Sequence, residues 1–164
     1  MKKQTVILSA VALLFIAPIL LFSDCFAQTI NLSDQIRVMS FNIRVDTGSW
    51  SGRCDKVCQI IRDHNPDIIG VQEALLHQVE QIQQQLPGYT NYAVGRSDGL
   101  QKGESCAIYY KTDRFQLNEK GTFWFSDTPD EVSHGWDTWP RICTWLYLTD
   151  KNTGKGFYVY NVHL

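Results

Sequence analysis

Asp67-Ile68-Ile69-Gly70-Val71-Gln72-Glu73 is a short apolar run that finishes on a carboxylate, and it decides the fold class of this chain. Two further runs share the pattern: Ile36–Phe41 leads into Asn42, and Phe157–Tyr160 leads into Asn161-Val162-His163. Runs of this length that are rich in Val, Ile and aromatic residues are typical of buried strands. Because ligands of α/β proteins bind in the crevice beyond the strand ends, an amide, a carboxylate and an imidazole there predict an active site.

Two amphipathic helices are predicted to alternate with the first strands. From about Arg53 to Asn65, apolar side chains repeat at three and four residues, and the dipeptide Asn65-Pro66 ends the pattern. A second helix is predicted from about Ala74 to Leu86, where Pro87-Gly88 stops it. Strand, helix, strand, helix is the pattern of an α/β layer.

After Gly88 the chain changes to strands and loops. The predicted strands are Ser105–Lys111, Gly121–Ser126, Arg141–Thr149 and Gly156–His163, and the polar connection Asp127–Pro140 is predicted to be a loop. Arg141–Leu148 is apolar on both faces, which predicts that it is covered on both sides. Two helices can cover only one face of a sheet. We therefore expect a mixed sheet with helices on one face and its other face bare.

The charge balance is slightly acidic. The chain has 15 Lys and Arg residues against 17 Asp and Glu residues, a formal net charge of −2. This argues against a general surface for polyanions, while a local basic groove stays open. A phosphate substrate is therefore expected to be held by a metal and a few local donors.

The N-terminus has the pattern of a secretory signal peptide. Lys2 and Lys3 precede the apolar run Val6–Phe22, and Cys25-Phe26-Ala27 offers small residues at a cleavage position. We predict a signal peptide at 1–27, a domain at 28–164 with no integral membrane segment, and a periplasmic or extracellular location. A retained membrane anchor is the alternative, because the apolar run nearly reaches spanning length.

Four cysteines follow the predicted cleavage position: Cys54, Cys58, Cys106 and Cys143. Export would permit disulfides, but the sequence does not choose among the three pairings. Cys54 and Cys58 are four residues apart on a predicted helix, a spacing that also suits a metal pair. No second Cys or His pair stands at matching spacing, so we expect both to be buried as small hydrophobes.

Several motifs together resemble the endonuclease/exonuclease/phosphatase superfamily, which has the deoxyribonuclease I-like fold. The motifs are Met39-Ser40-Phe41-Asn42-Ile43-Arg44, Val71-Gln72-Glu73, Gly103-Glu104 and Asn161-Val162-His163-Leu164. Phe125–Asp130, Gly135-Trp136-Asp137 and Pro140-Arg141 resemble a secreted bacterial branch of that superfamily. The resemblance covers 36–164 and implies half of a four-layer α/β/β/α sandwich.

The resemblance implies a role for each motif residue. A divalent metal, Mg²⁺ with Mn²⁺ or Ca²⁺ as alternatives, would be held by Glu73 with help from Asn42, since hard cations prefer oxygen ligands. Glu104, Asn161 and His163 would be catalytic, and Arg141 would bind the substrate phosphate. Each has a structural alternative: a helix-start carboxylate for Glu73, a solvated charge for Glu104, a strand-edge arginine for Arg141 and a packed imidazole for His163.

The superfamily also carries, well downstream of the His motif, an Asp-x-Asn element and an Asp-His pair that activate the attacking water. Neither stands after His163 in this sequence. The resemblance therefore implies the N-terminal part of a metal-dependent phosphoester hydrolase, truncated after the Asn-x-His motif and inactive by itself. Its substrate could be a nucleic acid, a nucleotide, a lipid headgroup, as in a sphingomyelinase, or a sugar or inositol phosphate, and no stable protein partner is evident. The rival from another class is a secreted binding module without catalysis. Trp136 and Trp139 could stack on a base or sugar ring, or merely pack.

Overall fold

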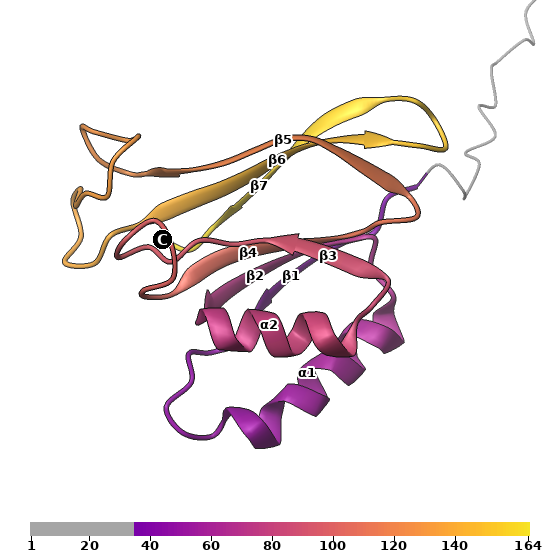
Figure 1. The fold of residues 1–164 in the computed structure, drawn as a ribbon, viewed down its shortest axis with the longest axis horizontal. Helices are drawn as coiled ribbons and strands as arrows, with labels where there is room; N and C mark the ends of the chain where they lie inside the picture. Colours follow the sequence, from indigo (N-terminus) through magenta and orange to yellow (C-terminus); the bar gives the residue numbers. More distant parts are fainter. Residues whose placement is uncertain (1–34) are drawn as a thin grey trace, which may run out of the picture. The chain divides into compact units, whose positions relative to one another are not determined.

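The computed structural model describes residues 35–164, so the predicted signal peptide lies outside the described residues. The chain order, shown in Figure 1, is β1 (Val38–Asn42), α1 (Trp50–His64), β2 (Ile68–Ala74), α2 (Leu76–Gln85), β3 (Tyr89–Tyr92), β4 (Ser105–Lys111), β5 (Phe115–Trp124), β6 (Ile142–Asp150) and β7 (Gly156–Val162). Within 35–164, no helix is long and apolar enough to cross a membrane.

The first sheet has the order β1-β2-β4-β3. Its β1 and β2 strands are parallel, whereas β4 runs antiparallel to β2 and to β3, so the predicted mixed sheet is confirmed. Helices α1 and α2 cover one face of it (Figure 1). Ile61 of α1 and Ile82 of α2 pack there with Ile69 and Tyr109 of the sheet. The α/β class and the helices on one face are thus as predicted.

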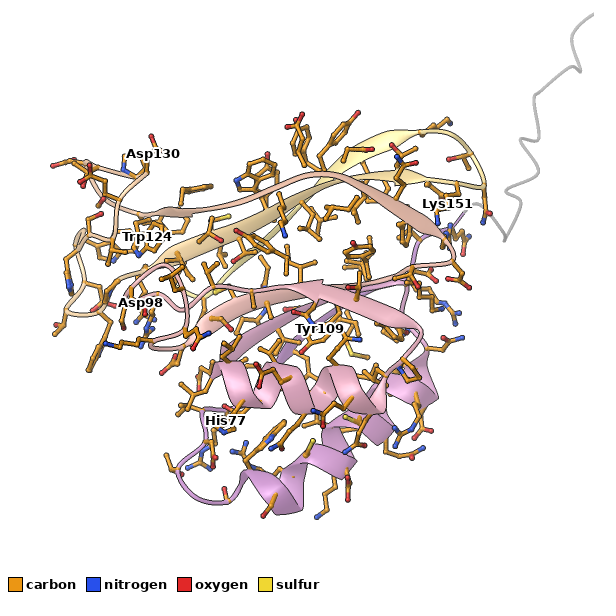
Figure 2. All side chains as sticks on the ribbon, in the orientation of Figure 1. His77, Asp98, Tyr109, Trp124, Asp130 and Lys151 are labelled. Carbon is orange, nitrogen blue, oxygen red and sulfur yellow. The ribbon has the colours of Figure 1, made fainter. Side chains whose placement is uncertain are left out.

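A second sheet, with the order β5-β6-β7, lies on the other face of the first sheet (Figure 1). Side chains fill the space between the sheets (Figure 2). One buried cluster joins Ile68 and Ile108 of the first sheet with Phe115, Leu146 and Leu148. The expectation of one sheet with a bare inner face is therefore wrong. These three consecutive strands pair antiparallel with one another, β5 with β6 and β6 with β7, and form a sheet of their own.

The outer face of the second sheet carries aromatic rings. Tyr147 and Tyr158 stack with 4.7 Å between ring centroids, and Tyr160 follows at 6.0 Å from Tyr158. Tyr158 is 52% exposed and Tyr160 is 60% exposed. The prediction that the strand beginning near Arg141 is covered on both sides is therefore wrong for its outer face, where neighbouring rings give partial burial.

Three element boundaries differ from the sequence prediction. Helix α1 begins at Trp50, because Asp46 Oδ1 accepts hydrogen bonds from the Gly48 and Trp50 amides ahead of the apolar stripe. Strand β5 is longer than predicted, because its first half alternates polar and apolar side chains on a sheet edge. The short edge strand β3 was not predicted.

The four cysteines in the described part of the chain are free and buried. Cys54 and Cys58 lie on the buried face of α1, which confirms the prediction that they pack as small hydrophobes. Burial raises the pKa of the Cys58 and Cys106 thiols to about 12, so both stay protonated at neutral pH.

Candidate active site

A hollow lies where β2, β4, β6 and β7 meet at one end of the two sheets. It is lined by Glu73, Arg96, Glu104, Ser105, Cys106, Pro140, Ile142 and His163, and we call it the site hollow. Figure 1 marks the end of the chain, C, beside the loop that joins β3 to β4. The structure thus brings together three of the residues predicted from sequence: Glu73, Glu104 and His163.

Glu73 sits at an irregular point of β2. The pairing with β4 shifts register between Val71 and Ala74, and Glu73 has a positive φ of 59°, which is unusual for a residue with a side chain. Such backbone conformations cluster at functional sites. The bulge turns Glu73 out of the regular alternation of the strand and into the site hollow.

Neutral donors orient the Glu73 carboxylate. Asn42 Nδ2 donates to Oε1 at 2.7 Å, and the Val45 amide donates to Oε2 at 3.1 Å. The hydrogen bond from Asn42 is the largest influence on the Glu73 pKa, which lies below its ordinary value of 4.5 despite the opposing effect of burial. Glu73 is therefore ionised at neutral pH.

Asn42 holds its own side chain in place through its carbonyl. Asn42 Oδ1 accepts from the Arg44 amide at 2.9 Å, so the amide group links the end of β1 to Glu73. Within 35–164 there is no group of three or more His, Cys, Asp or Glu side chains that could hold a metal. Glu73 and Asn42 supply one carboxylate and one amide oxygen, which fits a Mg²⁺ ion that keeps several waters and also binds substrate phosphate.

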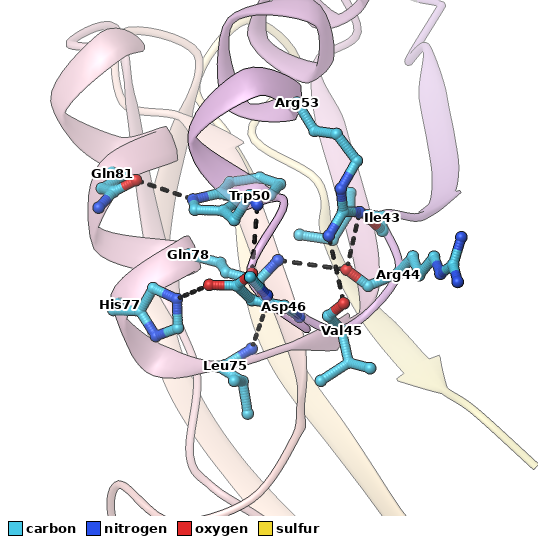
Figure 3. Close-up of polar contacts among 11 residues, drawn as sticks. Ile43, Arg44, Val45, Asp46, Trp50, Arg53, Leu75, His77, Gln78 and Gln81 are labelled. Atoms are coloured by element: carbon cyan, nitrogen blue, oxygen red, sulfur yellow. Dashed lines mark hydrogen bonds and ion pairs between the residues drawn. The ribbon is translucent and has the colours of Figure 1, made fainter.

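The segment after β1 is held rigidly against α1 and α2 (Figure 3). Arg53 Nη2 donates to the Val45 carbonyl at 3.2 Å, and Gln78 Nε2 donates to the Arg44 carbonyl at 3.2 Å. Asp46 faces His77, with 3.0 Å between Oδ2 and Nε2. These contacts fix the Val45 amide that binds Glu73.

His163 lies next to Glu73 across the two sheets. Its Nε2 is 3.8 Å from Glu73 Oε1, too long for a hydrogen bond and close enough for charge to matter. Its side chain is 31% exposed. An imidazole here can donate to an anionic oxygen that enters the site hollow.

Asn161 is buried one step deeper, between the sheets. Its Nδ2 donates to the Val71 and Ala107 carbonyls, each at 2.9 Å, and its Oδ1 accepts from Gln72 Nε2 at 2.7 Å. A Cβ added to Gly70 would stand 2.9 Å from Asn161 Cγ, so only glycine leaves room for this contact. The group formed by Gly70, Gln72 and Asn161, which we call the amide bracket, fixes β7 on β2.

The amide bracket changes the role that the geometry gives Asn161. Both donor positions of its side chain and its oxygen are used inside the protein, and the residue is 5% exposed. Gln72 precedes Glu73 directly, and Asn161, near the end of β7, precedes His163 by two residues. In this geometry the polar atoms of the Asn161 side chain are turned into the protein, toward β2 and β4.

Glu104 lines the site hollow together with Arg96, which the sequence prediction missed. Arg96 Nη2 is 3.3 Å from Glu104 Oε1, and the Arg96 amide donates to the Glu104 carbonyl at 3.0 Å. Gly103, at φ +83°, allows the turn that brings them together. Arg96 belongs to no strand-end pattern. Its nearness to Gly103-Glu104 in sequence was the one available signal.

Arg141 lies at the border of the site hollow and is not one of its lining residues. Its Nε donates to Asp137 Oδ2 at 2.6 Å, and this hydrogen bond is the main reason that the Asp137 pKa is lowered. The guanidinium is thus directed at the loop before β6. The arginine that the structure places in the hollow is Arg96.

This fold is shared with a known family. The family model described as the Endonuclease/Exonuclease/phosphatase family matches residues 39–151, so the chain belongs to this family. The solved structure of a mannosyl-6-phosphatase of Bacteroides thetaiotaomicron matches this chain with 43% sequence identity and a TM-score of 0.77. The match covers 79% of this chain and 52% of that one.

Two relatives come from other branches of life. An uncharacterized protein of Acanthamoeba polyphaga mimivirus is 34% identical over 123 residues, which is 70% of this chain and 46% of that protein. The Ccr4 exoribonuclease subunit of the CCR4-Not complex of Emericella nidulans is 26% identical over 80% of this chain and 24% of its own length. The chain therefore spans about half the length of the structure and the viral protein it matches.

Proposed function

We propose that this chain carries the phosphate-binding part of the active site of an exported, metal-dependent phosphoester hydrolase. The observation that carries the proposal is the Glu73 carboxylate, which is ionised and accepts its hydrogen bonds from the neutral donors Asn42 and Val45. A carboxylate whose charge is not already matched by a close lysine or arginine is what a hard divalent cation requires.

The residues of the site hollow divide the work as follows. Glu73 and Asn42 hold the metal, Mg²⁺ in our proposal, which when bound neutralises phosphate charge. His163 donates a hydrogen bond to a phosphate oxygen, and Arg96 adds positive charge held in place by Glu104. Water attacks phosphorus in line. The family resemblance assigns activation of that water to downstream elements, so we expect residues 1–164 alone to be nearly inactive.

A sugar phosphomonoester is the substrate class that we place first, because a mannosyl-6-phosphatase is 43% identical over 79% of this chain. A phosphodiester of RNA comes second, since the Ccr4 relatives are exoribonuclease subunits at 26% identity. Nucleotides, lipid headgroups and inositol phosphates stay as further alternatives. The rival from another class remains a binding module without catalysis.

The test uses the protein as its gene encodes it, with mannose 6-phosphate and release of inorganic phosphate as the readout. We expect turnover that depends on Mg²⁺ and is lost with EDTA. Glu73→Gln should abolish it, whereas Glu80→Gln, which removes an exposed glutamate of α2, should leave it unchanged. No turnover of mannose 6-phosphate, of RNA or of bis-p-nitrophenyl phosphate would contradict the hydrolase proposal and favour the binding module.

A further inference from the structure

The loop at 127–140 carries two exposed tryptophans whose surroundings differ. Trp136 is 68% exposed and packs edge-to-face on Phe125, with 5.9 Å between ring centroids. Trp139 is 58% exposed, and the Arg96 guanidinium carbon lies 5.6 Å from its ring centroid. The Trp136 indole thus packs on Phe125 at the base of the loop, whereas the Trp139 indole contacts Arg96, a residue that lines the site hollow.

A chain of contacts joins Trp139 to the phosphate end of the site. Arg96 stacks on Trp139 with its guanidinium and pairs with Glu104 through Nη2. Pro140, the next residue after Trp139, itself lines the site hollow. Arg96 is further fixed by its backbone, since its carbonyl accepts from Trp124 Nε1 at 2.9 Å. Trp139 is therefore a supported flat surface at the border of the hollow.

The charge of the same loop restricts what can stack there. Between 127 and 140 the acidic side chains are Asp127, Asp130, Glu131 and Asp137, and the segment contains no lysine or arginine. Asp137 is paired with Arg141, so the acidic border consists of Asp127, Asp130 and Glu131. Figure 2 shows Asp130 at the outer end of this loop, with Trp124 at its base. A nucleic acid presents a phosphate at every nucleotide, and an acidic border repels those beyond the one being cleaved.

A single sugar phosphate fits both features. Its one phosphate occupies the site hollow, and its uncharged ring carries hydroxyl groups that can donate to carboxylates. The less polar face of the ring can lie on an indole, as apolar ligand faces do on aromatic pocket walls. Both the acidic loop and the exposed indole then become favourable contacts.

We propose that Trp139, supported by Arg96, is the platform for the sugar ring of a phosphomonoester substrate, and that the acidic loop at 127–140 disfavours nucleic acid. This proposal rests on the proposed function and deepens it. Trp136, although more exposed, serves the packing of the loop on Phe125 and is not part of the platform.

The experiment compares Trp139→Ala with Trp136→Ala in the protein as its gene encodes it. The two probes are mannose 6-phosphate and ethyl phosphate, which has no ring. We expect Trp139→Ala to raise KM for mannose 6-phosphate about tenfold with kcat nearly unchanged, and to leave ethyl phosphate hydrolysis unaltered. Trp136→Ala should change KM by less than about twofold, and Trp139→Phe should recover most of the affinity.

A binding measurement separates this proposal from the hydrolase proposal. Saturation-transfer NMR with mannose 6-phosphate detects the sugar ring whether or not the ester is cleaved, and the signal should fall in Trp139→Ala and persist in Trp136→Ala. Equal signals in the two variants, or equal KM values, would overturn the platform while leaving hydrolysis of phosphoesters intact. If Trp139→Ala instead selectively weakens cleavage of single-stranded RNA, the indole stacks on bases and the carbohydrate assignment is wrong.

Discussion

Strand β2 is flanked by two carboxylates that illustrate opposite uses of the same chemical group. At its start, Asp67 accepts from the Arg37 amide at 2.8 Å and pairs with Lys111 at 3.0 Å and Arg114 at 2.9 Å. At its end, Glu73 accepts from Asn42 and from the Val45 amide, which are both neutral. The pKa of each carboxyl is lowered, yet only the first has its charge matched by close cations.

The difference separates a carboxylate paired within the fold from the one that we propose holds a metal. Asp67 belongs to a network that continues through Arg114 to Asp150, at 3.1 Å, and ties the first sheet to the second. Its negative charge is paired with positive side chains within the fold. Glu73 is held as firmly, but its negative charge stays available to a ligand. A lowered pKa alone therefore does not mark a site, because burial raises the pKa of Asp67 but hydrogen bonds and ion pairs within the fold more than reverse this, and the hydrogen bond from Asn42 lowers that of Glu73.

Removal of the charge at the functional end should have the largest effect. Glu73→Gln keeps the shape of the side chain, so we expect turnover to fall on the order of a hundredfold or more while the melting temperature stays near that of the wild type. Calorimetric titration with Mg²⁺ should show the accompanying loss of affinity. An unchanged Mg²⁺ affinity would mean that the metal is held elsewhere, and the comparison would fail.

Removal of the Asp67 charge should instead lower stability and leave activity unchanged. Asp67→Asn removes the charge that Lys111 and Arg114 share, although Arg114 keeps its pair with Asp150, and we expect this to lower the free energy of unfolding by about 3 kcal/mol. The activity per folded molecule should be unchanged. Asp113→Asn, on an exposed carboxylate two residues after Lys111, serves as the control and should stay within about 0.5 kcal/mol in a urea titration. If Asp67→Asn and Asp113→Asn lower the free energy of unfolding equally, the ion pairs of Asp67 do not stabilise the fold more than an exposed carboxylate does.

Much of this arrangement could be predicted from the sequence because strand ends and helical stripes are local signals. The run that finishes on Glu73 predicted both the strand and the polar end, and the stripe through Cys54 and Cys58 predicted the buried face of α1. Arg96 could not be predicted, because it reaches the site hollow through a loop whose shape depends on Gly103. The pairing of Glu104 with Arg96 is likewise a property of that loop.

The second sheet shows a different limit. An apolar pattern on both faces of β6 indicates burial but does not say what provides it, and half of that pattern proved to be rings stacked on an outer face. For Asn161, strand alternation predicted the same face as His163, but β7 ends at Val162. Alternation does not report depth. The contact with Gly70, nearly a hundred residues earlier in the chain, is what buries it.

The amide bracket offers a finer test, because it joins β2, the strand next to both carboxylates, to β7 of the second sheet. Asn161→Ala removes the side-chain donor to the Val71 and Ala107 carbonyls and the shortest of the hydrogen bonds that Gln72 Nε2 donates, and we expect a loss of about 2 kcal/mol in unfolding free energy. Gly70→Ala should cost a similar amount by crowding Asn161. In the double variant the methyl group fills the space of the missing amide, so the combined loss should be smaller than the sum by about 1 kcal/mol. Strict additivity in denaturant titrations would mean that the two residues do not share one contact.

The smallest expected effect concerns acid stability, where the two carboxylates should again differ. Burial by itself would raise the pKa of Asp67, but the Arg37 amide and the Lys111 ammonium more than reverse this, and the pKa lies below its ordinary value of 3.8. A carboxyl whose folded pKa is lowered adds stability that is fully present above its unfolded pKa and is lost as the pH falls through the folded value.

We therefore expect the unfolding free energy of the metal-free wild type to be level from about pH 7 to pH 5 and to decline below about pH 4. Asp67→Asn should flatten that decline clearly. Glu73→Gln should flatten it less, because His163 lies 3.8 Å from Glu73, whereas Lys111 and Arg114 lie 3.0 Å and 2.9 Å from Asp67. The measurement is a series of urea titrations between about pH 7 and pH 3. A steeper acid dependence removed by Glu73→Gln than by Asp67→Asn would reverse the assignment of the two carboxylates.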